Sequence, residues 1–140
     1  IYIMACDTSV RQNSINTNKI KWDDHKIWFR NKLNSKKTKI YIGELNKVPF
    51  GQIRFDHVDG FYLIDFSVIS YERGKGLGKY LLFEGIKFIK KEDLNPKFRA
   101  LVKFNNISSI KVFEKCGFIE LNTKTINNNK FIIFENLNFL

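Results

Sequence analysis

The chain has 140 residues, which corresponds to one domain, because domains usually contain about 100–200 residues. Hydrophobic residues make up 44% of it and aromatic residues 15%, with only two prolines, so the composition excludes an intrinsically disordered protein. No purely apolar run approaches the roughly 20 residues of a transmembrane helix, which excludes a membrane-spanning protein.

The net charge is strongly positive. Lys and Arg number 24 against 14 Asp and Glu, a balance of +10, which suggests nucleic acid, anionic lipid or a phosphorylated ligand as a partner. However, most of the cations are lysines, they form no block of five or six, and Asn and Ile are also abundant. That pattern is typical of the codon usage of an A+T-rich genome, so charge alone leaves both interpretations open.

Two cysteines, Cys6 and Cys116, are too few and too far apart for a disulfide scaffold or a zinc cluster, which favours a reducing compartment. Residues 1–6 lack the basic segment of a signal peptide, so we expect a cytoplasmic protein. Because the chain begins with Ile rather than Met, we also expect a trimmed domain whose first strand is incomplete.

Hydrophobic periodicity predicts the element order α β β β α β α β β, preceded by a polar loop over residues 8–19. Helices are expected at 22–34, 76–91 and 105–116, and strands at 39–45, 48–57, 61–69, 98–104, 118–121 and 130–136. The helix at 76–91 is apolar around most of its circumference, so it must pack on a sheet.

A glycine-rich segment, residues 72–79, lies between a predicted strand and this helix. Three glycines in five residues exceed what a plain turn needs, which indicates close approach of a ligand to the backbone. Free amides at the helix N-terminus, with Arg73 and Lys75 beside them, would bind an anion such as phosphate. The alternative is a glycine turn with incidental cations.

In the helix predicted at 105–116, Asn106 and Ser109 fall inside the apolar arc. Buried polar groups need partners, so these two side chains either cap the helix or contact a polar ligand. For Asn106 alone, capping is the better interpretation.

The two segments together resemble the GNAT superfamily of acyl-CoA-dependent N-acetyltransferases. Residues 73–78 are similar to its Arg/Gln-x-x-Gly-x-Gly/Ala pyrophosphate loop, and residues 106–118 to its Asn, Ser and Gly-Phe helix and strand. The resemblance implies an α/β (α+β) sandwich with a mixed, mainly antiparallel sheet of six to seven strands and about four helices. It also implies one N-acetyltransferase domain over residues 1–140, lacking part of its first strand.

The resemblance further implies acetyl-CoA as co-substrate, no metal, and direct attack of an amine on the thioester. The expected cofactor residues are Phe66, Ser67, Val68, Arg73, Gly74, Lys75, Gly76, Leu77, Gly78, Lys79, Asn106, Ser109 and Phe113. Phe113 stands where many family members carry the tyrosine that acts as general acid, and Cys116 is expected to serve packing. Asp65 is the first candidate for the base that takes the amine proton, with Glu72 a weaker one.

Residues 10–29 resemble acetyltransferase domains that modify nucleotide-linked amino sugars, including those of pseudaminic-acid-type pathways. We therefore expect His25, Trp28 and Tyr62 at the acceptor site, although a histidine between aromatic residues also suits a purely structural role. A protein N-terminus is the main alternative acceptor, and a catalytically inactive acyl-CoA-binding module is a second alternative. The expected partner is a small-molecule amine, and neither nucleic acid nor a membrane is expected. A homodimer or a fusion to another enzyme domain stays open.

Overall fold

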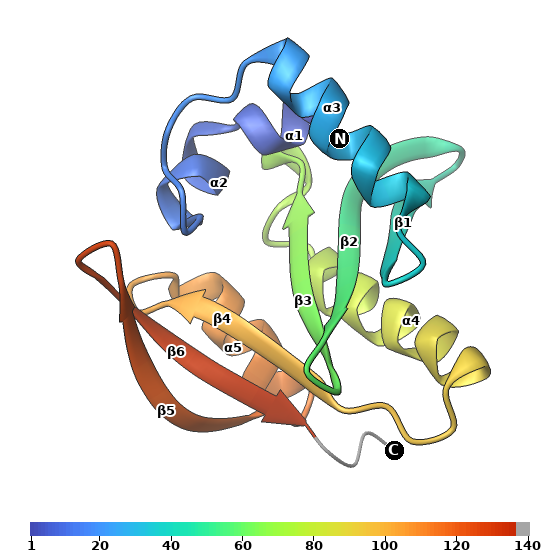
Figure 1. The fold of residues 1–140 in the computed structure, drawn as a ribbon, viewed down its shortest axis with the longest axis vertical. Coiled ribbons are helices and arrows are strands. Elements are labelled where there is room, and N and C mark those ends of the chain that lie inside the picture. The colour runs from blue at the N-terminus through green and yellow to red at the C-terminus, as the bar shows by residue number, and fades with distance from the viewer. Residues whose placement is uncertain (137–140) are drawn as a thin grey trace.

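A computed structural model of the protein describes residues 1–136 (Figure 1). Its elements in chain order are α1 (Tyr2–Cys6), α2 (Thr8–Asn13), α3 (Trp22–Asn34), β1 (Thr38–Leu45), β2 (Val48–Val58), β3 (Phe61–Val68), a 3-10 turn η1 (Ser70–Glu72), α4 (Leu77–Glu92), β4 (Phe98–Lys103), α5 (Ile107–Lys115), β5 (Ile119–Ile126) and β6 (Asn129–Asn136). The order predicted from residue 22 onward is confirmed.

The strands form one six-stranded sheet in the order β1-β2-β3-β4-β6-β5. Within residues 1–136, β3 and β4 run parallel and the other neighbouring pairs run antiparallel. The predicted fold class is confirmed: the part of the chain that the structure describes has six strands, and five α-helices where about four were expected.

Helices cover both faces of the sheet. A Cβ atom on Gly85 of α4 would lie only 3.0 Å from the Phe55 ring and 3.1 Å from Ile53, so α4 packs tightly against one face of β2. Arg54, between these two residues, points to the opposite face and stacks on Trp28 of α3. The apolar predicted helix thus lies on the sheet, as expected, and α3 covers the other face (Figure 1).

The loop predicted over residues 8–19 was wrong at its start, because residues 8–13 form α2. Helix α2 is preceded by a further short helix, α1 (Tyr2–Cys6), where an incomplete first strand was expected. The Asp7 carboxylate accepts a hydrogen bond of 3.1 Å from the Val10 amide and caps α2. Because α2 is short and polar, it has no hydrophobic periodicity, and only this cap could have indicated it. The strand expected at 118–121 also extends further, to Ile126 in β5.

Candidate active site

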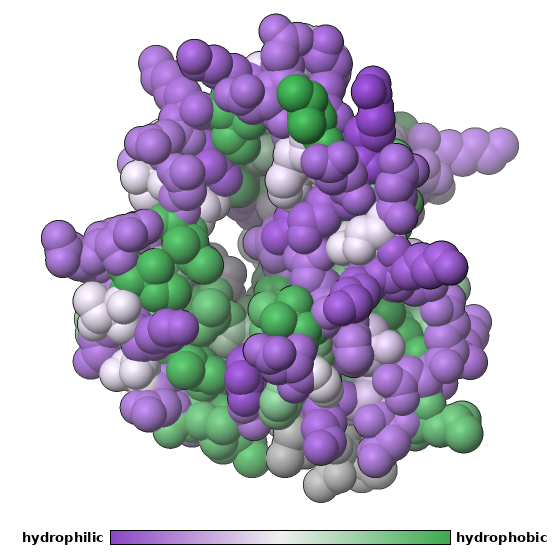
Figure 2. Space-filling model, viewed as in Figure 1, coloured by the Kyte–Doolittle hydropathy of each residue, from purple (hydrophilic) through white to green (hydrophobic). Residues whose placement is uncertain are grey.

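The parallel strands β3 and β4 separate after a short contact. They pair at Tyr62 with Phe98 and at Leu63 with Arg99, although β3 continues to Val68 and β4 to Lys103. A cavity of about 430 Å³ fills the space between them, and Figure 2 shows the molecule hollowed there. Its walls come from α2, β3, β4, the glycine segment 72–79 and α5. The site therefore depends on this separation of the two strands.

One end of the cavity is formed by the glycine segment and the start of α4. Gly76 is the N-cap residue of α4, and no side chain among the described residues caps this terminus. The amides of the first helical turn therefore lack intrahelical acceptors, and the positive end of the helix dipole adds to their attraction for an anion. A Cβ atom at Gly74 or Gly76 would meet nothing within 4 Å, so a ligand can approach the backbone here. This anion cradle fits the pyrophosphate of an acyl-CoA.

Arg73 lines the cavity, but its guanidinium is held by protein groups. Its Nε donates to the Val68 carbonyl at 2.9 Å, and its Nη2 donates to the Asp7 carboxylate at 2.9 Å. The hydrogen bond from Arg73 is the main reason that the pKa of Asp7 lies below its usual value. Arg73 thus ties the glycine segment to the N-terminus of α2. Lys75, the other predicted cation, pairs with Glu72 at 2.9 Å.

The β3 wall of the cavity presents backbone groups as well as side chains. The Ile69 amide donates to the Phe50 carbonyl of β2, whereas the Tyr62 amide donates to the Lys97 carbonyl on the β4 side. Because backbone groups alternate along a strand, Phe66 and Val68 direct their N–H and C=O groups towards the cavity. The Val68 carbonyl already accepts a hydrogen bond from Arg73. The backbone N–H and C=O groups left for an extended ligand are therefore those of Phe66.

The α5 wall contains the three residues expected from that helix. Asn106 caps α5, since its side-chain oxygen accepts from the Ser109 amide at 3.3 Å, which confirms the capping interpretation. Asn106 and Ser109 also line the cavity. Phe113 is 3% exposed and its ring contacts Phe66 and Phe134, both at 5.7 Å between centroids. A phenyl ring has no proton to donate.

Cys116 lies near Phe113 and is packed against the core. Burial raises the pKa of its thiol, while the positive charge of Lys79 opposes that shift. The thiol is therefore protonated at neutral pH. These surroundings agree with the packing role expected for it.

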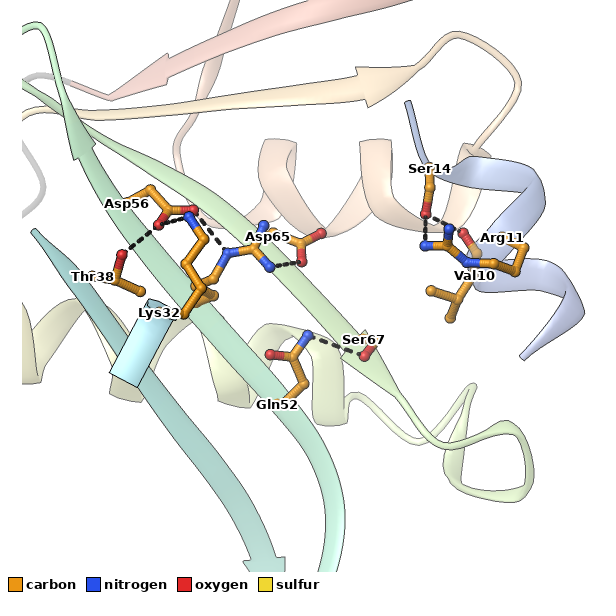
Figure 3. Close-up of polar contacts among 10 residues, drawn as sticks. Val10, Arg11, Ser14, Lys32, Thr38, Gln52, Asp56, Asp65 and Ser67 are labelled. Atoms are coloured by element: carbon orange, nitrogen blue, oxygen red, sulfur yellow. Dashed lines mark hydrogen bonds and ion pairs between the residues drawn. The ribbon is translucent and has the colours of Figure 1, made fainter. Parts of the chain in front are cut away.

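Asp65 lines the cavity from β3, and its side chain is 56% exposed. Arg54 lies beside it, with 3.4 Å between Nη1 and the carboxylate (Figure 3). Arg54 is itself held by Asp56 at 2.8 Å, and Asp56 also accepts from Lys32 at 2.6 Å and from Thr38 at 2.7 Å. Burial raises the pKa of Asp56, but these hydrogen bonds outweigh burial and the net shift is downward. Asp56 therefore fixes the position of Arg54. The side of the Asp65 carboxylate that does not contact Arg54 faces the cavity.

The residues expected at the acceptor site lie elsewhere. His25 is 5% exposed inside an aromatic cluster with Tyr2, Trp22, Trp28 and Phe29. Burial, and then the positive charge of the N-terminus, lower its pKa. His25 therefore occupies a packing position, the structural alternative considered for it.

Trp28 and Tyr62 do not line the cavity either. Trp28 lies under Arg54, with 5.2 Å between the guanidinium and the ring centroid. Tyr62 donates from its hydroxyl to Asp93 at 3.1 Å, and its ring contacts His57. The cavity is lined instead by Ser9, Val10 and Asn13 of α2 and by Ser14 directly after it. Sequence reasoning missed these four residues because it predicted a loop.

Within the described part of the chain, no helix is long and apolar enough to cross a membrane. Residues 1–136 also contain no group of three or more His, Cys, Asp and Glu side chains arranged to hold a metal ion.

Several acetyltransferases superpose on nearly the whole chain at low sequence identity, so they share its fold. The ribosomal-protein-alanine N-acetyltransferase from Brucella melitensis has a TM-score of 0.80 at 17% identity, over 97% of this chain and 92% of that one. Aminoglycoside acetyltransferase AAC(6')-Ib in complex with coenzyme A has a TM-score of 0.81 at 18% identity, over 97% and 86%. The spermidine N-acetyltransferase from Vibrio cholerae, in complex with CoA and spermine, has a TM-score of 0.80 at 13% identity, over 96% and 84%.

The sequence profile of the Acetyltransferase (GNAT) family matches residues 6–118. The chain therefore belongs to this family and is an acetyl-CoA-dependent N-acetyltransferase. No curated protein matches the chain by sequence.

Proposed function

We propose that the protein transfers the acetyl group of acetyl-CoA to the amine of a nucleotide-linked amino sugar. One observation carries this proposal: a single cavity runs between β3 and β4 and is lined both by the glycine segment and by Asp65. An acyl donor bound at the glycine segment and an amine beside Asp65 would meet inside it.

In this arrangement the first-turn amides of α4 hold the pyrophosphate of acetyl-CoA. The N–H and C=O groups of Phe66 pair with the pantetheine arm in the manner of an added strand. Asn106 and Ser109 contact the cofactor from α5, and Lys79 adds a positive charge beside the phosphates. Arg73 acts indirectly, because it holds the glycine segment in place through Val68 and Asp7.

Acetyl-CoA supplies the reactive thioester, and the protein removes a proton from the amine. An amine attacks only as the neutral base, so its proton must pass to an acceptor, which we assign to the Asp65 carboxylate. Arg54 lies 3.4 Å from the Asp65 carboxylate and helps to hold it at the cavity. The leaving thiolate takes its proton from solvent, because Phe113 has none to give. Glu72 is the weaker candidate for the base, since Lys75 already occupies it.

The acceptor class is inferred from the α2 wall. The Ser9 hydroxyl and the side-chain carbonyl of Asn13 offer uncharged hydrogen-bonding groups, which suits the hydroxyl groups of a sugar. The Ser14 hydroxyl is already bonded to the Val10 carbonyl and to Arg11. The net charge of +10 attracts an acceptor that carries its own phosphates and repels polyamines and basic peptides. An aminoglycoside enzyme shares the fold, but so do enzymes for spermidine and a ribosomal protein. A protein N-terminus therefore stays the rival acceptor.

The base assignment can be tested with Asp65→Asn. We expect kcat to fall by about 10²–10³-fold with little change in acetyl-CoA affinity, because general-base catalysis contributes on that order. Asp59→Asn is the matched control, since Asp59 lies in the β2–β3 turn and does not line the cavity. Full activity of Asp65→Asn across the pH range would place the base elsewhere.

The acceptor assignment can be tested by measuring thiol release from acetyl-CoA with a panel of amines. We expect the highest kcat/KM with a UDP-linked 4-amino sugar and much lower values with spermidine or an N-terminal peptide. A panel in which peptide or polyamine exceeds every amino sugar would refute the acceptor class while the acetyltransferase activity stands.

We keep the cytoplasm as the predicted location, because Cys6 and Cys116 are both free thiols.

A further inference from the structure

A second cavity, of about 630 Å³, lies on the other side of α2 from the first. It is lined by Cys6, Thr8, Arg11, Gln12, Thr17, Lys19, Lys103 and Asn105. We propose that this cavity binds the diphosphate of the acceptor while the amino sugar occupies the first cavity. This inference rests on the proposed function and adds to it a separate site for the phosphates.

Helix α2 forms the wall between the two cavities. Its residues Ser9, Val10, Asn13 and Ser14 line the first cavity, whereas Thr8, Arg11 and Gln12 line the second. Lys103, the last residue of β4, lines both. Its Nζ donates to the Gln12 carbonyl at 2.6 Å, which places the ammonium group at the end of α2, where the cavities meet. Lys103 is therefore the residue at which a ligand that uses both cavities would have to pass from one to the other.

The second cavity carries positive charge without a compensating carboxylate. Within residues 1–136, Arg11, Lys19 and Lys103 form no ion pair. The Arg11 guanidinium is held by neutral oxygens: the Ala5 carbonyl at 2.7 Å, the Asn16 carbonyl at 2.8 Å, the Asn18 carbonyl at 3.4 Å and the Ser14 hydroxyl at 2.9 Å. Figure 3 shows the contact with Ser14. Asp7, the carboxylate nearest in sequence, is engaged by Arg73. The charge of Arg11 adds to the potential of the cavity, and Lys19 and Lys103 are the cations that could contact a ligand directly, which favours a ligand with two or more negative charges.

The lining also offers neutral hydrogen-bonding groups in the hydroxyls of Thr8 and Thr17 and the amide of Asn105. Together with the cations, these groups match the oxygens of a diphosphate. The acyl donor also carries phosphates, but the second cavity shares no lining residue with the glycine segment 72–79, where we place them. The acceptor is therefore the source of phosphate that we assign to the second cavity.

The proposal can be tested by calorimetric titration of UDP into the full chain saturated with CoA. We expect UDP to bind under these conditions, because the two ligands use different cavities. Lys19→Gln should weaken UDP binding about tenfold, the value of one charge-assisted hydrogen bond, and Lys103→Gln should do at least the same. Lys124→Gln is the matched control, since Lys124 lies on β5 and lines neither cavity, and its UDP affinity should equal that of the wild type.

Three results would overturn the inference: no UDP binding to the CoA-saturated protein, displacement of UDP by CoA, or equal UDP affinity of Lys19→Gln, Lys103→Gln and the wild type. Displacement by CoA would mean that the phosphates of the cofactor use this cavity. The proposed function fails separately, through the amine panel described above, if peptide or polyamine exceeds every amino sugar in thiol release. Thiol release with amino sugars that lack phosphate, together with no UDP binding, would refute the second site alone.

Discussion

The anion cradle can be tested by placing a carboxylate in it with Gly76→Glu. Gly76 precedes the first turn of α4, and a Cβ atom there has open space, so the new side chain fits without a clash. We expect the variant to fold and to lose acetyl-CoA binding. The new carboxylate would repel the pyrophosphate and compete with it for the helix amides.

The size of the effect follows from Coulomb's law. Two unit charges 4 Å apart repel by about 4 kcal/mol at an effective dielectric constant of about 20, which corresponds to roughly a thousandfold loss of affinity. Folding is affected less. Gly76 has φ +79°, and an L-residue in this left-handed conformation costs about 1–2 kcal/mol.

The matched control is Gly60→Glu. Gly60 also has φ +79° and open space around its Cβ position, but it lies in the β2–β3 turn and does not line the cavity. Both variants should show similar losses in the free energy of unfolding, measured by urea denaturation. Calorimetry should show that Gly60→Glu retains acetyl-CoA affinity and Gly76→Glu does not. Equal affinities in two folded variants would refute the cradle as the pyrophosphate site.

Three further predictions concern stability and positioning. Burial is the main reason that the pKa of His25 is lowered in the folded protein. As the pH drops below about 6.5, His25 of the unfolded chain therefore takes up a proton before that of the folded chain, and the free energy of unfolding should fall. In urea denaturation at pH 7 and pH 5, His25→Phe should flatten this dependence, and an unchanged slope would assign it to another group. Asp7→Asn should cost about 0.5–1 kcal/mol near pH 7 and raise the KM for acetyl-CoA several-fold by releasing Arg73. Because the folded Asp7 pKa is lowered, that difference in stability should vanish as the pH falls through the folded pKa, and a KM equal to the wild-type value would show that Arg73 does not position the glycine segment. Asn106→Ala should cost about 1 kcal/mol in unfolding free energy by removing the α5 cap, and Asn106→Ser should recover most of it; equal losses in both variants would refute the capping role.

The order of elements after residue 22 could be predicted from the sequence because its signals are local. Alternating hydrophobic residues mark β2 and β3, the almost wholly apolar α4 had to be buried against a sheet, and Asp59-Gly60 marks the turn between strands. The glycine segment and the Asn106 cap depend on residues within a few positions of each other. Such features follow from backbone conformation and short-range hydrogen bonds, so one stretch of chain is enough to indicate them.

The tertiary structure alone decided which side chains face the cavity. Arg73 was expected to meet pyrophosphate, but it binds Asp7, 66 positions away, and His25 was expected to meet the acceptor, but it is buried among aromatic rings. Asp65 faces the cavity beside Arg54, and α2 forms one of its walls, because β3 and β4 separate after two paired positions. These contacts join segments that are distant in the chain, and their geometry depends on how the sheet and its helices pack, which no local pattern encodes.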